Sequence, residues 1–198
     1  MQFEFCVNLA MKIGILGGTF NPIHIGHLIL AEEVREKLEF NRIIFVPTYL
    51  APHKDNTDIA PAEYRYEMVK MAIKRNKYFS VSDIEIKRNG QSYTIDTVRE
   101  FKRMYLKDEL YFIIGSDLLK YLDDWKDLFE IIKMISFIVA TRPGYPLEEI
   151  PSYISTIPIR AVDISGFEIR KAIKEGKSFR YLVPEAVFEY INRKRLYK

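Results

Sequence analysis

The sequence predicts an α/β fold, in which helices cover a doubly wound parallel sheet and a small helical part follows near the C-terminal end. Short apolar runs alternate with segments whose apolar residues recur at helical spacing. One run, residues 110–114, has no polar residue except Tyr111, as is typical of a strand covered on both faces. Such alternation favours parallel strands joined by right-handed crossovers, with ligands bound beyond their carboxyl ends. The predicted architecture is therefore Rossmann-like.

The first half of the chain is predicted to alternate strand and helix. Residues 13–16 and 42–46 are apolar runs of the kind that form buried strands. The apolar residues of 28–38 recur at helical spacing, and those of 62–75 do the same after a proline-containing loop. Residues 79–86 are expected to be the next strand.

The second half continues the alternation. Thr94 has the residue type of a helix N-cap and precedes apolar residues at helical spacing. Ser165 and Glu168 match the capping-box signature, so a helix should open there and stop near Gly176. Pro184 suits the start of a final helix, because proline is favoured in the first helical turn. The strands expected in this half lie at residues 110–114, 135–140 and 158–162.

A glycine-rich turn joins the first predicted strand to the first predicted helix, and it reads Gly17-Gly18-Thr19-Phe20-Asn21-Pro22-Ile23-His24-Ile25-Gly26-His27. Its two leading glycines let the backbone turn sharply and approach a ligand closely. The helix that begins near His24 offers the N–H groups of its first turn and a positive dipole end to an anion. Because His24 and His27 share one face of the first helical turn, both can donate to the same phosphate. The turn therefore predicts a nucleotide-phosphate site.

Composition narrows the classes of function. The 198 residues suit one domain, and contents of 48% hydrophobic and 29% charged residues are ordinary for a globular protein. The net charge is +3 and the basic residues are scattered, which favours small anionic substrates over nucleic acid. Cys6 is the only cysteine, which fits a reducing compartment. No apolar run is long enough to span a membrane, and residues 1–10 lack a secretory signal's basic residues. We expect a cytoplasmic protein, and a homo-oligomer is compatible with the sequence.

The segment His24-Ile25-Gly26-His27 resembles the signature of the HIGH nucleotidyltransferase superfamily. With the preceding strand and the Gly-Gly-Thr-Phe turn, the chain more narrowly resembles the bacterial nicotinate-nucleotide adenylyltransferases, whose pattern is GGTFDPxHxGHL. Asn21 stands where that family usually has Asp; it keeps the turn-forming carbonyl and lacks the charge. The resemblance extends from Met11 to Tyr197 through several ordered motifs.

The resemblance implies a set of mononucleotide-binding residues. Lys54, in Pro52-His53-Lys54, would reach a phosphate as a point charge. Backbone amides in Ser92-Tyr93-Thr94 would meet the carboxylate of the pyridine ring, and a helix N-terminus suits that charge. This segment favours an acid over an amide substrate. The indole of Trp125 would stack on the ring, and Lys126 is assigned to the same site.

The resemblance also implies an ATP site. Arg170 would clamp the β- and γ-phosphates at a second helix N-terminus. Gly166 and Phe167 replace the family's Ser and Thr there, so two hydroxyl donors are missing. Thr141–Pro146 matches the family as well, and we interpret it only as a turn, with no role for Arg142. The other residues assigned to ATP are Gly17, Gly18, Thr19, Phe20, Gly26, Gly115, Asp117, Ser165 and Ile169.

The implied reaction is adenylyl transfer from ATP to nicotinate mononucleotide, which gives deamido-NAD and pyrophosphate in NAD biosynthesis. The attacking phosphate is already anionic at neutral pH, so no general base is needed and catalysis rests on positioning and charge stabilisation. His24, His27 and Arg170 are the expected catalytic residues. No clustered carboxylates for a protein-bound metal stand out in the sequence, so we expect Mg²⁺ to arrive with ATP.

Three other interpretations stay open. Another transferase of the superfamily, such as pantetheine-phosphate adenylyltransferase, is usually shorter and gives no reason for the Ser92–Thr94 and Trp125 motifs. A non-catalytic nucleotide sensor would not need the intact pair His24 and His27. A fragment of a class I aminoacyl-tRNA synthetase would be expected to carry a KMSKS-like segment and a basic face.

We expect residues 11–198 to form a single nucleotidyltransferase domain, because the first strand starts directly at Met11. Residues 1–10 are then a dispensable extension. The alternative is an added edge strand, since Phe3, Phe5 and Val7 alternate with other residues.

Overall fold

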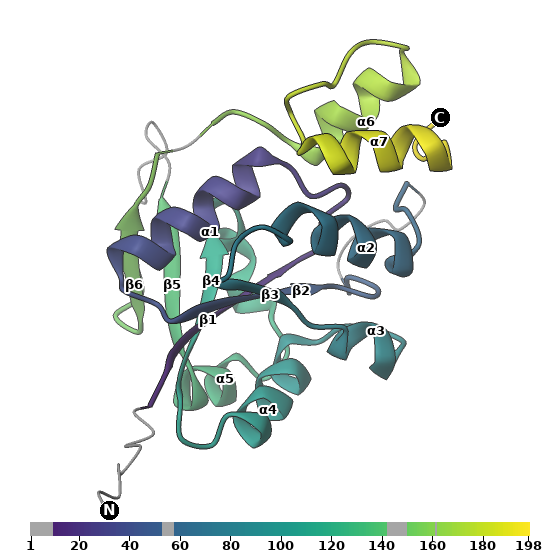
Figure 1. Ribbon diagram of the computed structural model, residues 1–198. Coiled ribbons are helices and arrows are strands. Elements are labelled where there is room, and N and C mark those ends of the chain that lie inside the picture. Colours follow the sequence, from purple (N-terminus) through teal and green to yellow (C-terminus); the bar gives the residue numbers. More distant parts are fainter. Residues whose placement is uncertain (1–9, 53–57, 142–149, 161) are drawn as a thin grey trace, which may run out of the picture.

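The protein is described by a computed structural model that covers residues 10–52, 58–141, 150–160 and 162–198 (Figure 1). Its centre is a six-stranded sheet with the order β3-β2-β1-β4-β5-β6. Every neighbouring pair is parallel, as predicted. The strands are β1 (Lys12–Gly18), β2 (Arg42–Pro47), β3 (Phe79–Val81), β4 (Glu109–Gly115), β5 (Ser136–Thr141) and β6 (Ile154–Pro158).

Helices cover both faces of the sheet. Those on one face are α1 (Ile25–Lys37), α2 (Ala62–Ile73), α6 (Gly166–Lys174) and α7 (Glu185–Lys194) (Figure 1). Those on the other face are α3 (Ile84–Arg88), α4 (Thr94–Met104) and α5 (Leu128–Met134) (Figure 1). A 3₁₀ helix, η1 (Ser116–Asp124), follows β4. The predicted Rossmann-like fold with a small C-terminal helical part is therefore confirmed.

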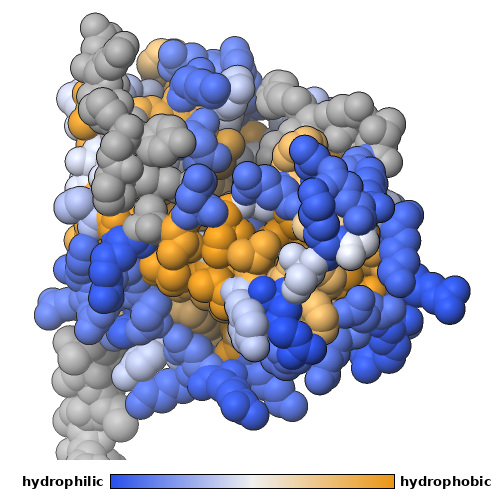
Figure 2. Space-filling view, turned by 90° about the horizontal axis from the view of Figure 1, so that it is seen from above, coloured by the Kyte–Doolittle hydropathy of each residue, from blue (hydrophilic) through white to orange (hydrophobic). Residues whose placement is uncertain are grey.

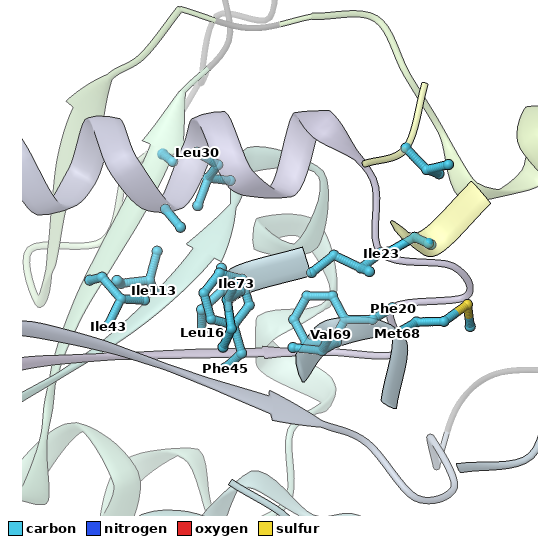
Figure 3. Close-up of a cluster of buried hydrophobic side chains, with 14 of the residues drawn as sticks. Leu16, Phe20, Ile23, Leu30, Ile43, Phe45, Met68, Val69, Ile73 and Ile113 are labelled. Carbon is cyan, nitrogen blue, oxygen red and sulfur yellow. The ribbon is translucent and has the colours of Figure 1, made fainter. Parts of the chain in front are cut away.

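Each face of the sheet has its own hydrophobic core. On the first face, Leu16, Ile43 and Phe45 of the strands share a core with Met68, Val69 and Ile73 of α2 (Figure 3). The second core joins the opposite faces of the same strands to α4 and α5. Strand residues that follow one another thus enter different cores, which explains why the strands read as continuous apolar runs.

The C-terminal helices extend the first core. Ile169 of α6 and Val187 of α7 are completely buried in the same cluster as the sheet residues. Seen from above, the face that α1, α6 and α7 cover shows a central area of hydrophobic residues bordered by hydrophilic ones (Figure 2). Leu28 of α1 and Phe188 of α7 are partly buried and pack against this core. The small helical part is thus continuous with the main fold.

Two predicted strands were placed wrongly. The run 79–86 is a strand only to Val81, because the backbone then turns at Ser82 and forms α3, a helix too short to show helical periodicity. The last strand is β6 rather than 158–162. Its pairing with β5 ends where Pro158 meets Thr141, the last residue of β5.

Three smaller differences concern helices. The N-cap of α4 is Tyr93, so Thr94 is the first helical residue. Neither α5 nor η1 was predicted, because their lengths of 7 and 9 residues leave little room for periodicity. Among the described residues, the structure contains no helix with the length and apolar character that crossing a bilayer requires.

Candidate active site

The strand order reverses between β1 and β4, and the site lies where these two strands end. β1 pairs with β2 on one side and with β4 on the other. The chain leaves β1 and β4 toward opposite faces of the sheet, and such a switch point is where open α/β sheets bind their ligands. The glycine-rich turn begins at the end of β1, Gly115 is the last residue of β4, and Asp117 comes just after it. The topology therefore brings these two predicted ATP-binding segments to one edge.

The two histidines lie together at the start of α1. His24 is the N-cap, and its ring stacks on that of His27 with 3.7 Å between the centroids. The backbone N–H of His24 donates to Nδ1 of His27 at 3.2 Å. Because Nδ1 accepts this bond, a neutral His27 carries its proton on Nε2. His27 can thus donate from Nε2 to an anion at the helix N-terminus.

Gly26 and Phe20 hold this pair in place. A Cβ at Gly26 would lie 3.1 Å from Nδ1 of His24, so a side chain there would crowd the ring. Phe20 meets the edge of His27 at 5.0 Å and is itself buried, with only 2% of its surface exposed (Figure 3). Phe20, which was assigned to ATP, therefore acts through its side chain as a support for His27.

Asn21 connects the glycine-rich turn to two other parts of the chain, residues 58–60 and Tyr197. Its Nδ2 donates to the carbonyl of Asp58 at 2.9 Å, and its Oδ1 accepts from the N–H of Ala60 and from the hydroxyl of Tyr197. An aspartate could accept the last two bonds and could not donate the first. The amide thus explains why Asn21 suits this chain in the place of the family's Asp.

Arg170 reaches the same turn from α6. Its Nη1 donates to the backbone carbonyl of Asn21 at 2.8 Å. A Cβ at Gly166 would lie 2.9 Å from that carbonyl oxygen, so the glycine lets α6 approach the turn closely. Ser165 caps α6 by accepting from the N–H of Glu168, as predicted. The departure at Gly166 therefore has a packing reason, whereas Phe167 is exposed and no contact explains it.

Arg65 is a buried cation that sequence reasoning did not single out. It is 1% exposed, and its guanidinium donates to three backbone carbonyls, those of Thr19, Tyr49 and Ala60, at 2.7, 3.0 and 2.8 Å. Burial lowers the pKa of Arg65, yet a guanidinium stays protonated at neutral pH. Arg65 thus ties together the three loop segments that border the site.

The segment Ser92-Tyr93-Thr94, which is predicted to bind the mononucleotide, is held in place by the buried side chain of Ser92. Ser92 is buried, and its Oγ accepts from the N–H of Tyr49 at 3.0 Å. Its side chain therefore holds the loop after β2. Tyr93 lies under Lys126, whose Nζ is 4.6 Å from the ring centroid, so the structure brings these two predicted residues together. Thr94 opens α4, whose first N–H groups are available to an anion.

Glu85 supports this segment and was also missed. It is buried in α3 and accepts from the hydroxyl of Thr97 in α4 at 2.7 Å. Burial raises the pKa of Glu85 above its ordinary value, and the bond from Thr97 opposes the shift. The hydrogen bond between Thr97 and Glu85 fixes α4 against α3. It therefore also fixes the direction in which the N-terminus of α4 points.

Trp125 is half-buried beyond the end of η1. Its ring meets Phe112 and Phe137 edge-on, at 5.8 and 5.9 Å between centroids. Asp117 is exposed, and a Cβ at Gly115 would lie 2.5 Å from its Oδ1, so the glycine makes room for that carboxylate.

Some predicted residues have another role or lie elsewhere. The side chain of Ile169 is part of the core, which leaves its backbone as the part able to meet a ligand. His53, Lys54 and Arg142 fall outside the described residues. Within the described ranges, no group of three or more His, Cys, Asp or Glu side chains is placed to hold a metal ion.

Comparisons with known proteins identify the family of this chain. Residues 15–172 match the family model described as cytidylyltransferase-like. A probable nicotinate-nucleotide adenylyltransferase of Thermus thermophilus is 44% identical over 188 residues, which cover 95% of this chain and 100% of that protein. A relative of the same name from Moorella thermoacetica is 42% identical and covers 94% of this chain and 92% of its own.

A solved structure shares the fold. The nicotinic acid mononucleotide adenylyltransferase of Plasmodium falciparum, complexed with NaAD, has a TM-score of 0.78 at 20% identity. The match covers 94% of this chain and 97% of that one. On the strength of the relatives above 40% identity, which align with almost the whole chain, this protein belongs to the nicotinate-nucleotide adenylyltransferase family.

Proposed function

We propose that this protein transfers AMP from ATP to nicotinate mononucleotide, with deamido-NAD and pyrophosphate as products. The observation that carries the proposal is the stacked pair His24 and His27 at the N-terminus of α1, where the bond to Nδ1 of His27 directs its proton to Nε2. The two imidazoles lie together at a helix N-terminus. This arrangement stabilises a bound anion on which negative charge develops in the transition state.

The reaction is an in-line displacement at the α-phosphorus of ATP. An oxygen of the mononucleotide's 5′-phosphate forms the new P–O bond, and the bond to the bridging α–β oxygen breaks, with its electron pair leaving on pyrophosphate. His24, His27 and the turn amides of Gly17–Phe20 hold the α-phosphate. Arg170 stabilises charge on the leaving group, from a position fixed by the carbonyl of Asn21.

Mg²⁺ is proposed to enter with ATP. When bound to the phosphates it would neutralise part of their charge. No residue of this chain is assigned to the metal, because the expected donors are the oxygens of the phosphates. With ATP as substrate and a single cysteine, we place the reaction in the cytoplasm.

The N-terminus of α4 is proposed to select the acid form of the mononucleotide. The amides after Tyr93 begin that helix, and the Tyr93–Lys126 contact adds a positive charge beside it. The helix N-terminus and the positive charge both stabilise a bound carboxylate, and they stabilise a neutral carboxamide less. Trp125 supplies the ring face, and Lys54 stays a predicted phosphate ligand.

Pyrophosphate release with ATP and a panel of mononucleotides tests the function. We expect kcat/KM at least about tenfold higher for nicotinate mononucleotide than for its amide, because a charge-assisted bond contributes about 1.5–3 kcal/mol. Phosphopantetheine in the panel tests the rival transferase activity. Equal rates for acid and amide would refute the selectivity, and no release with either would refute the function.

A further inference from the structure

One carboxylate binds two cations of α6. Oδ2 of Asp58 lies 3.1 Å from Nε of Arg170, and its Oδ1 lies 2.7 Å from Nζ of Lys174. The two cations are four residues apart and therefore lie on the same face of the helix. The bonds from Lys174 and Arg170 hold the pKa of Asp58 below its ordinary value, so the carboxylate is ionised at neutral pH. The pair thus forms a site for an anion with two oxygens.

The backbone on which Asp58 sits is fixed independently of its side chain. The carbonyl of Asp58 accepts from Asn21, and the N–H of Ala60 donates back to Asn21. Arg65 holds the carbonyl of Ala60. The carboxylate is 45% exposed, so it can rotate away from α6 without any movement of the main chain.

One of the two cations reaches the turn that carries the proposed phosphate site. Arg170 contacts the carbonyl of Asn21, three residues before His24. Lys174 lies about 6 Å further along the helix, at 1.5 Å per residue. With an α-phosphate at His24 and His27, Arg170 is the cation of α6 that contacts the same turn, and Lys174 is the next cation on that face of the helix.

We propose that Asp58 is an internal competitor of the ATP phosphates: it occupies Arg170 and Lys174 in the free enzyme, and ATP displaces it, so that Lys174 becomes a second triphosphate ligand. The inference rests on the proposed function, because it takes ATP as the ligand of α6. A phosphate carries more charge than a carboxylate and offers more acceptor oxygens to the same donors. This competition lowers the apparent affinity for ATP, because only the fraction of free enzyme in which Asp58 has left Arg170 and Lys174 can bind the phosphates there.

Calorimetric titration of Asp58→Asn with ATP and with inorganic pyrophosphate tests the competition. Removing the competing charge should tighten both dissociation constants by about threefold or more, the scale of losing one or two exposed ion pairs. Glu175→Gln is the matched control. It removes an equal charge at the end of α6, where Glu175 pairs with Lys177 and Lys171, and should change neither constant by as much as twofold. Equal tightening in both variants would mean long-range electrostatics and would overturn the proposal, as would weaker binding by Asp58→Asn.

Lys174→Gln tests the second ligand. It should weaken pyrophosphate binding by about fivefold, whereas Lys171→Gln, on the same helix, should leave it within twofold. Equal effects of the two substitutions would overturn the role of Lys174. If the unaltered protein binds neither ATP nor pyrophosphate, the proposed function fails as well. If it binds both and Asp58→Asn binds them equally, only the competition is refuted.

Discussion

Among individual side chains, His27 has a ring whose position is held by two contacts. Its Nδ1 is engaged by the backbone of His24, so the ring cannot rotate without losing that bond. Its edge contact with Phe20 restricts the ring further. A donor held in advance of the reaction needs little reorganisation when charge develops, which is the condition for strong electrostatic catalysis.

His27→Ala should lower kcat by about 100-fold or more, the scale of removing one preorganised donor. The fold should persist, because His27 is only partly buried. Steady-state kinetics with both substrates saturating give the rate, and circular dichroism checks the fold. Losses below tenfold in both His27→Ala and His24→Ala would contradict a transition-state role for the pair.

Arg65→Lys should destabilise the protein markedly. A lysine ammonium cannot reproduce the planar fork that reaches Thr19, Tyr49 and Ala60 together, so at least one buried carbonyl loses a charged donor. A bond of this kind contributes about 1.5–3 kcal/mol, which lowers Tm by roughly 3–12 °C at this chain length. Thermal unfolding measures the shift. Arg75→Lys, at an exposed site just after α2, is the matched control, and an equal shift there would refute the special role of Arg65.

Among the helices and strands, the contact between α3 and α4 predicts a pH effect. Burial raises the pKa of Glu85, so above its ordinary value of 4.5 the folded protein binds more protons at this site than the unfolded chain. The stability contributed by Glu85 is therefore complete below that value and is lost as pH rises through the folded pKa.

The substitution Glu85→Gln should abolish the loss of stability that Glu85 causes as pH rises. The free energy of unfolding of the variant, relative to the unaltered protein, should increase as pH rises above 4.5, the ordinary value of the carboxyl. Urea unfolding from acid to neutral pH measures the difference, and the acid end serves as the control. A difference that does not change with pH would show that burial does not govern this carboxyl.

The helices and strands also show which elements can be predicted from the sequence. Long periodic segments such as α1 and α2, and apolar runs such as β1, were placed within a few residues. The five residues of α3 complete little more than one turn, so no periodicity separates them from a strand. The glycine-rich turn was recognisable because its residue types are themselves the signal. Arg65 was not, because a buried arginine and an exposed one look alike in a sequence.

For the molecule as a whole, the start of the sheet just after Met11 bears on the proposal that residues 1–10 are dispensable. The N–H of Met11 donates to Asp108 at 2.8 Å, and its carbonyl accepts from the N–H of Glu109 at 2.8 Å. A terminal ammonium at Met11 could still donate to Asp108, and would add a charge to that bond.

A chain that begins at Met11 should fold and stay active. All of the proposed site residues lie after Met11, so kcat and KM should be unchanged. Thermal unfolding gives the structural readout. A fall in Tm of about 10 °C, which corresponds to well over 1 kcal/mol at this size, would mean that the extension belongs to the fold.

The three partners of Arg65 are main-chain carbonyls, and this has an evolutionary consequence. Every amino acid supplies the same carbonyl, so the residues at 19, 49 and 60 can drift while the clamp persists. Pairwise covariation would accordingly miss Arg65, since no partner has to change with it. The clamp constrains the path and length of the three loops instead of their composition. A library that randomises side chains there at fixed loop length should retain folded members far more often than one that inserts a single residue.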